Sequence, residues 1–374
     1  MSQGELYHWL NYMRQCFRHL KFWQATVIGL YSYGIVQARH CAPSRVAEKL
    51  GLVGKADSLQ RRLERYLAND RICWQSCSRA WARWVLIRYH GERLILLVDE
   101  TKLGGLLSVM VVGLAYRGSC LPLAFWAYRP HAWPMSQVAL ITTLLGWIAP
   151  AIPPGVIPLV QADRGLGTSP DLIREIADHF HWHYLFRVQK QTRFRFSPNT
   201  LPCALSDLLP QHGQCWHGRG EAFKKAGWLA TEVHLLWGPV HREAWCLVTN
   251  CPGIDGWEYA VRYWQEGSFR DLKSDGWQWQ TSRITTPSHA NRLLLVMVLA
   301  YAWVLSLGSL AFDDPDLRGQ VVSADVTRYS LFRLGFRLLE RFAGGVQALI
   351  LTRFRDLLVF FDGPAPSRVK CVGA

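Results

Sequence analysis

The stretch RLILLVDET, residues 93–101, is a continuous apolar run that ends in acidic residues. Such a run is typical of a strand buried on both faces of a sheet, and we expect it to deliver the Asp99 carboxylate at its C-terminal end. A second apolar run, GVIPLVQADRG at residues 155–165, ends in Asp163. Because parallel strands place their C-terminal ends along one sheet edge, we expect the two carboxylates to lie near each other.

The segments around these two strands predict an α/β domain over residues 91–312. Residues 107–118 and 120–129 read as antiparallel strands that meet at Arg117-Gly118, and residues 181–189 read as a further strand. Helices are expected after Ser136 and after Ser169, each of which is placed to act as an N-cap. Residues 191–254 lose the alternation of strand and helix and predict an inserted β-rich segment of short antiparallel strands.

The chain's charge is positive and unevenly distributed. Its 374 residues exceed the usual size of one hydrophobic core, so more than one domain is expected. The 42 Lys and Arg exceed the 28 Asp and Glu, which gives a net charge of +14. Residues 1–90 alone hold 14 basic and 5 acidic residues, a net charge of +9. This balance suits a polyanion or an anionic membrane surface as the partner.

Residues 1–90 predict a helical module that reads DNA. In the segment DSLQRRLERYLAND, residues 57–70, an apolar stripe forms one face of a helix. The stripe consists of Leu59, Leu63, Tyr66 and Leu67, and it leaves Arg61, Arg62 and Arg65 to face outward. We interpret the module as a helical DNA-binding domain. An ordinary solvated helical domain is the alternative.

Three further features limit the class of protein. The ten cysteines form no zinc-ligand spacing and no dense disulfide framework, so they read as buried thiols in a reducing cytoplasm. His179, His181 and His183 alternate as in a strand, and a structural role is favoured over a metal site. Residues 293–312 are uncharged over a length that could span a bilayer, but we expect a buried helix. Residues 313–374 predict a helical C-terminal segment.

The stretch YAVRYWQEGSFRDLK, residues 259–273, predicts a helix with a functional stripe. At 100° per residue, Tyr259, Arg262, Glu266 and Lys273 fall within an arc of about 60°. A solvated face with an Arg262–Glu266 pair would give the same pattern. However, Glu266 could lean over Asp99 and Asp163, and three carboxylates that converge suit two Mg²⁺ ions, or Mn²⁺ in their place. Two such ions stabilise the attacking and leaving oxygens of a phosphoryl transfer.

The spacing of Tyr259, Arg262, Glu266 and Lys273 matches the Tyr-x2-Arg-x3-Glu-x6-Lys signature of DDE transposases of bacterial insertion sequences, the family-four type. LLVDET and LVQADRG also resemble the first and second acid segments of that family. The resemblance covers roughly residues 93–310. Many relatives have Trp directly after the signature Arg, where this chain has Tyr263, and a second acid after the catalytic Glu, where it has Gly267.

The resemblance implies a ribonuclease-H-like catalytic core with Asp99, Asp163 and Glu266 as the metal-binding triad. It also implies that Tyr259, Arg262 and Lys273 bind DNA phosphates, with Tyr263 available for base stacking. The implied activity is cleavage of transposon ends and strand transfer into target DNA, by a homodimer in a synaptic complex associated with the nucleoid in the cytoplasm. A nuclease without strand transfer, an inactive DNA-binding relic and a membrane protein are the competing interpretations.

Overall fold

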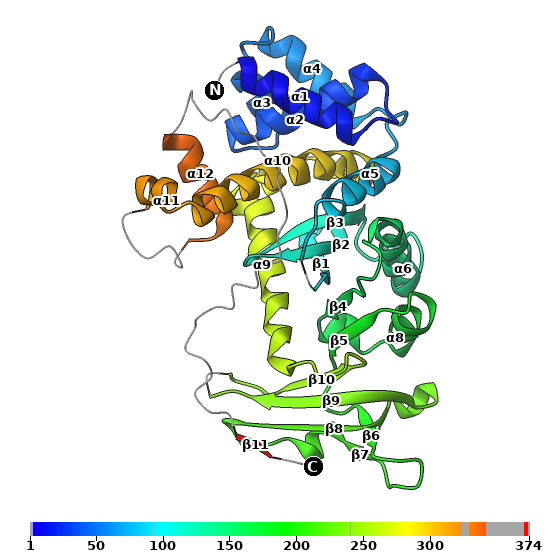
Figure 1. Cartoon of the computed structure of the whole chain (residues 1–374). Helices are drawn as coiled ribbons and strands as arrows, with labels where there is room; N and C mark the ends of the chain where they lie inside the picture. The colour runs from blue at the N-terminus through cyan, green and yellow to red at the C-terminus, as the bar shows by residue number, and fades with distance from the viewer. Residues whose placement is uncertain (1–2, 92, 240, 323–328, 342–369, 373–374) are drawn as a thin grey trace.

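The computed structural model describes residues 3–91, 93–239, 241–322, 329–341 and 370–372. Its N-terminal part is a layer of helices, as the sequence predicts: α1 (Gln3–Cys16), α2 (Phe22–Ala38), α3 (Pro43–Lys49), α4 (Ala56–Leu67) and α5 (Trp74–Leu86). The predicted apolar stripe of α4 is buried, and Arg61, Arg62 and Arg65 are exposed. Figure 1 shows α1 to α4 stacked over a long helix, α10 (Pro287–Asp313).

Helix α10 is a core helix, which confirms the interpretation of the apolar run at 293–312. Among the described residues it is the one helix long and apolar enough to cross a membrane, yet 89% of its most apolar window is buried inside the protein. The hydroxyl of Tyr66 on α4 donates to the Arg292 carbonyl at 2.8 Å, and the Arg292 guanidinium donates to the Leu67 carbonyl at 2.9 Å. The N-terminal helices therefore share a core with the rest of the chain.

Within the described ranges, eleven strands form one mixed sheet with the path β3-β2-β1-β4-β5-β10-β9-β8-β6-β7, and β11 pairs with β8. The first five strands are β1 (Ile95–Leu103), β2 (Leu107–Tyr116), β3 (Ser119–Tyr128), β4 (Leu159–Ala162) and β5 (His183–Arg187). Strands β1, β2 and β3 are antiparallel, whereas β4 runs parallel to both β1 and β5. Arg117 and Gly118 have φ of 45° and 81°, as a two-residue turn between right-twisted antiparallel strands requires.

The β-rich segment at 191–254 contains the expected antiparallel strands, but it extends the central sheet. Its strands are β6 (Arg193–Arg195), β7 (Cys203–Ala204), β8 (Gln214–Ala222), β9 (Leu229–Trp237) and β10 (Trp245–Thr249). β10 pairs antiparallel with β5, and β9 and β8 follow. The free edge of β5 explains this arrangement, because an unpaired strand edge offers N–H and C=O groups to the next strand.

The helices beside the sheet are α6 (Gln137–Ile148), α7 (Arg164–Gly167) and α8 (Pro170–Arg174). Ser136 caps α6 by accepting from the Ala139 N–H at 3.2 Å, and Ser169 caps α8 by accepting from the Leu172 N–H at 3.4 Å. Both predicted N-caps are therefore confirmed.

The expectation of an all-helical C-terminal segment is wrong in one part. The segment contains α11 (Pro315–Val321) and α12 (Leu331–Arg341), but it also contains β11 (Lys370–Val372), which pairs parallel with β8. Residues 342–369, which belong to the predicted helical C-terminal segment, lie outside the described residues. The interpretation of the cysteines as buried thiols also needs correction, because Cys215 on β8 is disulfide-bonded and the free thiol of Cys73 is exposed. Eight other cysteines have free thiols.

Candidate active site

The register of β1 against β4 brings Asp99 and Asp163 together. The parallel pairing ends with Val98 opposite Ala162, so Asp99 is the next residue of β1 and Asp163 directly follows the end of β4. Asp99 does not end its strand as the sequence predicts, because β1 continues in antiparallel pairing with β2 as far as Leu103. It ends only the parallel part of the ladder. This position still places its carboxylate at the edge where β4 stops.

The alternation of side chains along β1 sets the face on which Asp99 lies. Leu96 and Val98 pack into the larger core, which includes α10, whereas Ile95 and Leu97 pack into a smaller core with Tyr259 and Trp264. Because successive strand residues point to opposite faces, Asp99 shares the face of Ile95 and Leu97. That face is covered by the segment that carries Glu266. Apolar packing on both faces also explains why the strand shows no polar alternation.

The segment of the predicted stripe changes helix type twice. It begins as a 3₁₀ helix at Gly256–Arg262, continues as α9 (Tyr263–Arg270) and ends in a π turn at Asp271–Asp275. Asp255 caps its start by accepting from the Trp257 N–H at 3.0 Å. Side chains three residues apart eclipse in a 3₁₀ helix, so Tyr259 and Arg262 lie on one face. Both are buried, at 2% and 9% exposure, which excludes the solvated-face alternative for this half.

Arg262 contacts all three predicted acids. Its Nη2 lies 3.0 Å from Asp99 Oδ2 and 3.5 Å from Asp163 Oδ2, and its Nη1 lies 2.7 Å from Glu266 Oε1. The three carboxylates come from β1, from the end of β4 and from α9. One guanidinium therefore joins three segments that are far apart in sequence, and the predicted triad converges on it.

The surroundings of each acid differ. The Asp99 side chain is 14% exposed, and burial raises its pKa to about 6, with Arg262 opposing the shift and Asp163 adding to it. Asp163 also caps α7, since its Oδ1 accepts from the Gly165 N–H at 2.9 Å and the Leu166 N–H at 3.2 Å. The Glu266 side chain is half-exposed. Asp99 is thus the buried member of the set and Glu266 the accessible one.

Arg262 forms strong ion pairs, but one of its hydrogen-bond donors has no partner among the described residues. Burial lowers the pKa of its guanidinium, but the carboxylates, Asp99 above all, outweigh that effect and hold the pKa above its usual value. Its Nε is buried and has no hydrogen-bond partner within the part of the chain that the structure describes. A buried donor without a partner costs about 1–3 kcal/mol. The arrangement therefore satisfies the three acids while leaving one donor of Arg262 unsatisfied.

The donor set suits a hard divalent cation, but its spacing suits a guanidinium. Three carboxylates supply the oxygen ligands that Mg²⁺ prefers. In the described ranges, however, no three His, Cys, Asp or Glu residues are placed closely enough to hold a metal ion, and the alternating histidines at 179–183 form no such group either. The space between the carboxylates belongs to Arg262. The donor set would fit a metal ion by its chemistry, but the guanidinium occupies the space that the ion would need.

Two polar residues that the sequence analysis missed fix α9 against the sheet. Gln265 is fully buried, and its Nε2 donates to the Leu97 and Val111 carbonyls, each at 3.4 Å. Ser268 Oγ accepts from the Cys120 N–H at 2.7 Å and from the Tyr301 hydroxyl at 2.9 Å. These bonds tie α9 to β1, β2, β3 and α10. The signal in the sequence is a polar pair at i,i+3 beside the stripe.

The other residues of the predicted stripe have different surroundings. Tyr259 packs edge-on against Trp245, with ring centroids 5.3 Å apart, and its burial leaves little surface for the predicted contact with DNA. Tyr263 also packs on Trp245, but it is 44% exposed and presents an aromatic ring to solvent beside the acids. Lys273 is half-buried, and burial lowers its pKa while Asp99 partly opposes the shift. Lys273 therefore lies within the field of the acid cluster.

The predicted DNA-binding arginines of α4 are not part of this cluster. Figure 1 shows α4 on the far side of α10 from the strands that carry the acids. Arg61, Arg62 and Arg65 thus form a basic region apart from the acid cluster, on the outer layer of helices.

No family model and no curated protein matches the chain. Among solved structures, the chain is similar to a cryo-EM structure of the piggyBac transposase synaptic complex with hairpin DNA. The two chains are 11% identical, the match covers 90% of this chain and 76% of that chain, and the TM-score is 0.41. The interpretation of the site therefore rests on its own residues and their contacts.

Proposed function

We propose that this protein is a DNA transposase with a ribonuclease-H-like core, which cleaves DNA at transposon ends and transfers the freed strand into target DNA. The observation that carries the proposal is the contact of Arg262 with Asp99, Asp163 and Glu266. Arg262 thus connects Glu266, a second residue of the signature, to Asp99 and Asp163, the acids of the two apolar runs. A protein that used these carboxylates only as helix caps or surface charges would have no reason to gather them on one buried cation.

In this proposal Asp99, Asp163 and Glu266 hold two Mg²⁺ ions, or Mn²⁺. The ions, when bound, would stabilise the charge on the attacking and leaving oxygens of the phosphoryl transfer. Gln265 and Ser268 fix the helix so that Glu266 stays over the sheet edge. Lys273 binds a phosphate beside the scissile one, and Tyr263 offers its exposed ring to a base.

Arg262 has two positions in this proposal. Without metal it neutralises the three carboxylates, which would otherwise repel one another in a partly buried site. With metal it must release them, and its freed guanidinium then binds a DNA phosphate, for which its fork of donors is well suited. The unpartnered Nε supports a second position, because it marks the present one as incompletely satisfied.

The proposal includes partners and a location. Cutting two ends of one element needs two active sites, so we propose a homodimer that forms on DNA. The N-terminal helices are proposed as the domain that recognises the ends. A bacterial protein of this kind would work at the nucleoid in the cytoplasm.

The test begins with the DNA on either side of the gene. Short inverted repeats bounded by direct duplications are expected there. The purified protein should cut duplexes that carry those repeats when Mg²⁺ is added and join the cut strand to a plasmid. Cutting without joining would favour a nuclease with the same core. A protein that neither cuts nor joins such DNA would contradict the proposal.

A further inference from the structure

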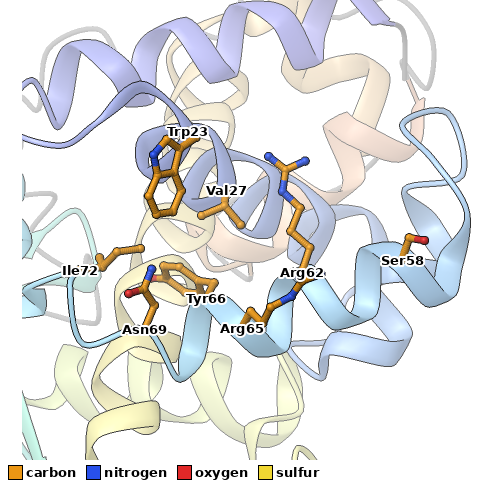
Figure 2. Close-up of a pocket in the computed structure, with 8 residues that line it drawn as sticks. All are labelled: Trp23, Val27, Ser58, Arg62, Arg65, Tyr66, Asn69 and Ile72. Carbon is orange, nitrogen blue, oxygen red and sulfur yellow. The ribbon is translucent and has the colours of Figure 1, made fainter.

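A groove of about 400 Å³ opens between α2 and α4, away from the acids. Figure 2 shows Trp23 and Val27 of α2 on one side, and Tyr66 and the two arginines of α4 on the other. The lining residues are Trp23, Val27, Ser58, Arg62, Arg65, Tyr66, Asn69 and Ile72. None of them is acidic. The groove therefore combines an aromatic wall, a positive wall and a polar end.

The two walls are available to a ligand. Trp23 is 48% exposed, which is unusual for so large an apolar side chain. Arg62 and Arg65 are exposed. Arg65 donates through Nε to the Arg61 carbonyl at 3.1 Å, which restrains its side chain. Within the described part of the chain, Arg62 has no hydrogen-bond or ion-pair partner. Tyr66 is buried, with its hydroxyl on the Arg292 carbonyl, and forms a fixed floor.

We propose that this groove binds one unpaired nucleotide of a DNA strand, with its base stacked on Trp23 and its phosphate held by Arg62 and Arg65. Guanidinium forks match phosphate oxygens, and an indole face stacks on any base. Asn69, at the polar end, can hydrogen-bond a base edge. The volume is in the range of pockets that hold small ligands, about 300–1,000 Å³. The proposal rests on the proposed function, since it names what the N-terminal helices bind.

The ligand must be unpaired because of the geometry of stacking. In a duplex both faces of each base are covered by neighbouring base pairs, so an indole cannot lie on one unless the base is at an end, in a gap or turned out of the helix. A duplex would still contact the arginines through its phosphates. The experiment must therefore separate stacking from charge.

The test measures binding of the full-length protein to a 12-nucleotide single strand, the same sequence as a blunt duplex, and a free mononucleotide. Trp23→Ala should weaken binding of the single strand by about tenfold, and Trp23→Phe should retain most of the affinity. Phe22→Ala is the matched control, because Phe22 is the neighbouring residue of α2 and is 66% exposed but does not line the groove. It should bind as the wild type does.

Two further experiments test the contact of Arg62 with a phosphate and the position of the base beside Trp23. Arg62→Ala should reduce the slope of log K against log salt by about 0.7, the contribution of one single-strand phosphate. A strand carrying 5-iododeoxyuridine should form a photo-crosslink to the peptide with Trp23, which Trp23→Ala should lose. Circular dichroism checks that each variant is folded.

Three results would overturn the proposal: equal loss in Trp23→Ala and Phe22→Ala, equal dependence on Trp23 for the blunt duplex and the single strand, or a mononucleotide bound as tightly as the strand. The last would indicate a small-molecule site. If Trp23→Ala loses the crosslink while the protein cuts no DNA, the groove stands and the proposed function fails. If the protein cuts DNA and Trp23→Ala binds the single strand as the wild type does, the proposed function stands and the proposal for the groove fails.

Discussion

The acid cluster and the α4 surface use charge in opposite ways. At the cluster, each of the three acids lies within 3.5 Å of the Arg262 guanidinium, and Arg262 is almost fully buried. On α4, Arg61, Arg62 and Arg65 are exposed along one helix, and the groove beside them holds no acid. Charges held in a buried site act mainly on the groups in direct contact with them, where solvent and salt screen them little. Charges left in solvent attract a polyanion over a distance near the Debye length, about 8–10 Å, and salt weakens them.

This difference predicts which variants separate catalysis from binding. Changes to the three acids of the cluster should remove chemistry and leave affinity for DNA. Changes on α4 should weaken affinity in a salt-dependent way and leave the chemistry of bound DNA unaltered.

The largest effect is expected for the triad. Asp99→Asn, Asp163→Asn or Glu266→Gln removes one negative charge at nearly constant shape and should lower cleavage in Mg²⁺ by about 10³-fold or more, while DNA binding stays within about twofold. Glu100→Gln is the matched control, because Glu100 is next to Asp99 on β1 but accepts from the Tyr128 hydroxyl at 2.9 Å instead. It should cleave normally. Near-normal cleavage by any one triad variant would remove that residue from the site.

A smaller effect is expected at Asp271, a partly buried acid on the same segment. Its hydrogen-bond partner is the Tyr301 hydroxyl, at 3.3 Å, rather than an arginine. Burial raises its pKa to about 7 in the folded protein, above that of the unfolded chain. The folded state therefore binds more protons between about pH 4 and 7, and stability falls as pH rises through that window. Asp271→Asn should remove this loss.

The measurement is urea unfolding of the wild type and Asp271→Asn at pH 5 and pH 8. The stability of the variant relative to the wild type should rise by about 1–2 kcal/mol between the two pH values. A constant difference between the two proteins would show that Asp271 ionises freely. The expected difference between Asp271, which has no guanidinium partner in the described part of the chain, and Asp99, which is paired with Arg262, would then not be supported.

The smallest effect is expected on α4. Arg61→Ala and Arg65→Ala together should weaken binding of duplex ends by several-fold and reduce the slope of log K against log salt by about 0.9 for each phosphate contact removed. The rate of cleavage at saturating DNA should not change. Lys224→Ala, which removes an exposed cation near the β8–β9 turn, is the control for total charge. An equal change in that control would assign the effect to net charge alone.

The sequence predicts the elements of the site better than their contacts. Apolar runs that end in acids identify β1 and β4, because buried parallel strands leave no polar alternation. Helical spacing selects Arg262 and Glu266, but it assumes one helix type throughout. The 3₁₀ turn that buries Tyr259 and the π turn that carries Lys273 depend on tertiary packing, which no local pattern encodes.

The sequence also does not show which strands pair with each other or which side chains Arg262 contacts. Residues 191–254 were expected to form an insertion, and their short antiparallel strands are confirmed, yet only the free edge of β5 decides that β10 joins the central sheet. In the same way, the sequence assigns Arg262 to DNA through the family resemblance. Its contact with all three acids follows from the register of β1 with β4 and from the anchoring of α9 by Gln265.

The central claim is that Arg262 and a metal ion compete for the same three carboxylates. Calorimetric titration of the wild type and Arg262→Ala with Mn²⁺, in the absence of DNA, tests it most directly. Loss of Arg262 removes the competing cation and the hydrogen bonds to charged partners, each worth about 1.5–3 kcal/mol, so the variant should bind the ion at least about tenfold more tightly. Arg270→Ala, which removes an exposed arginine from the same helix, should bind it as the wild type does. Unchanged or weaker binding in Arg262→Ala would contradict the claim.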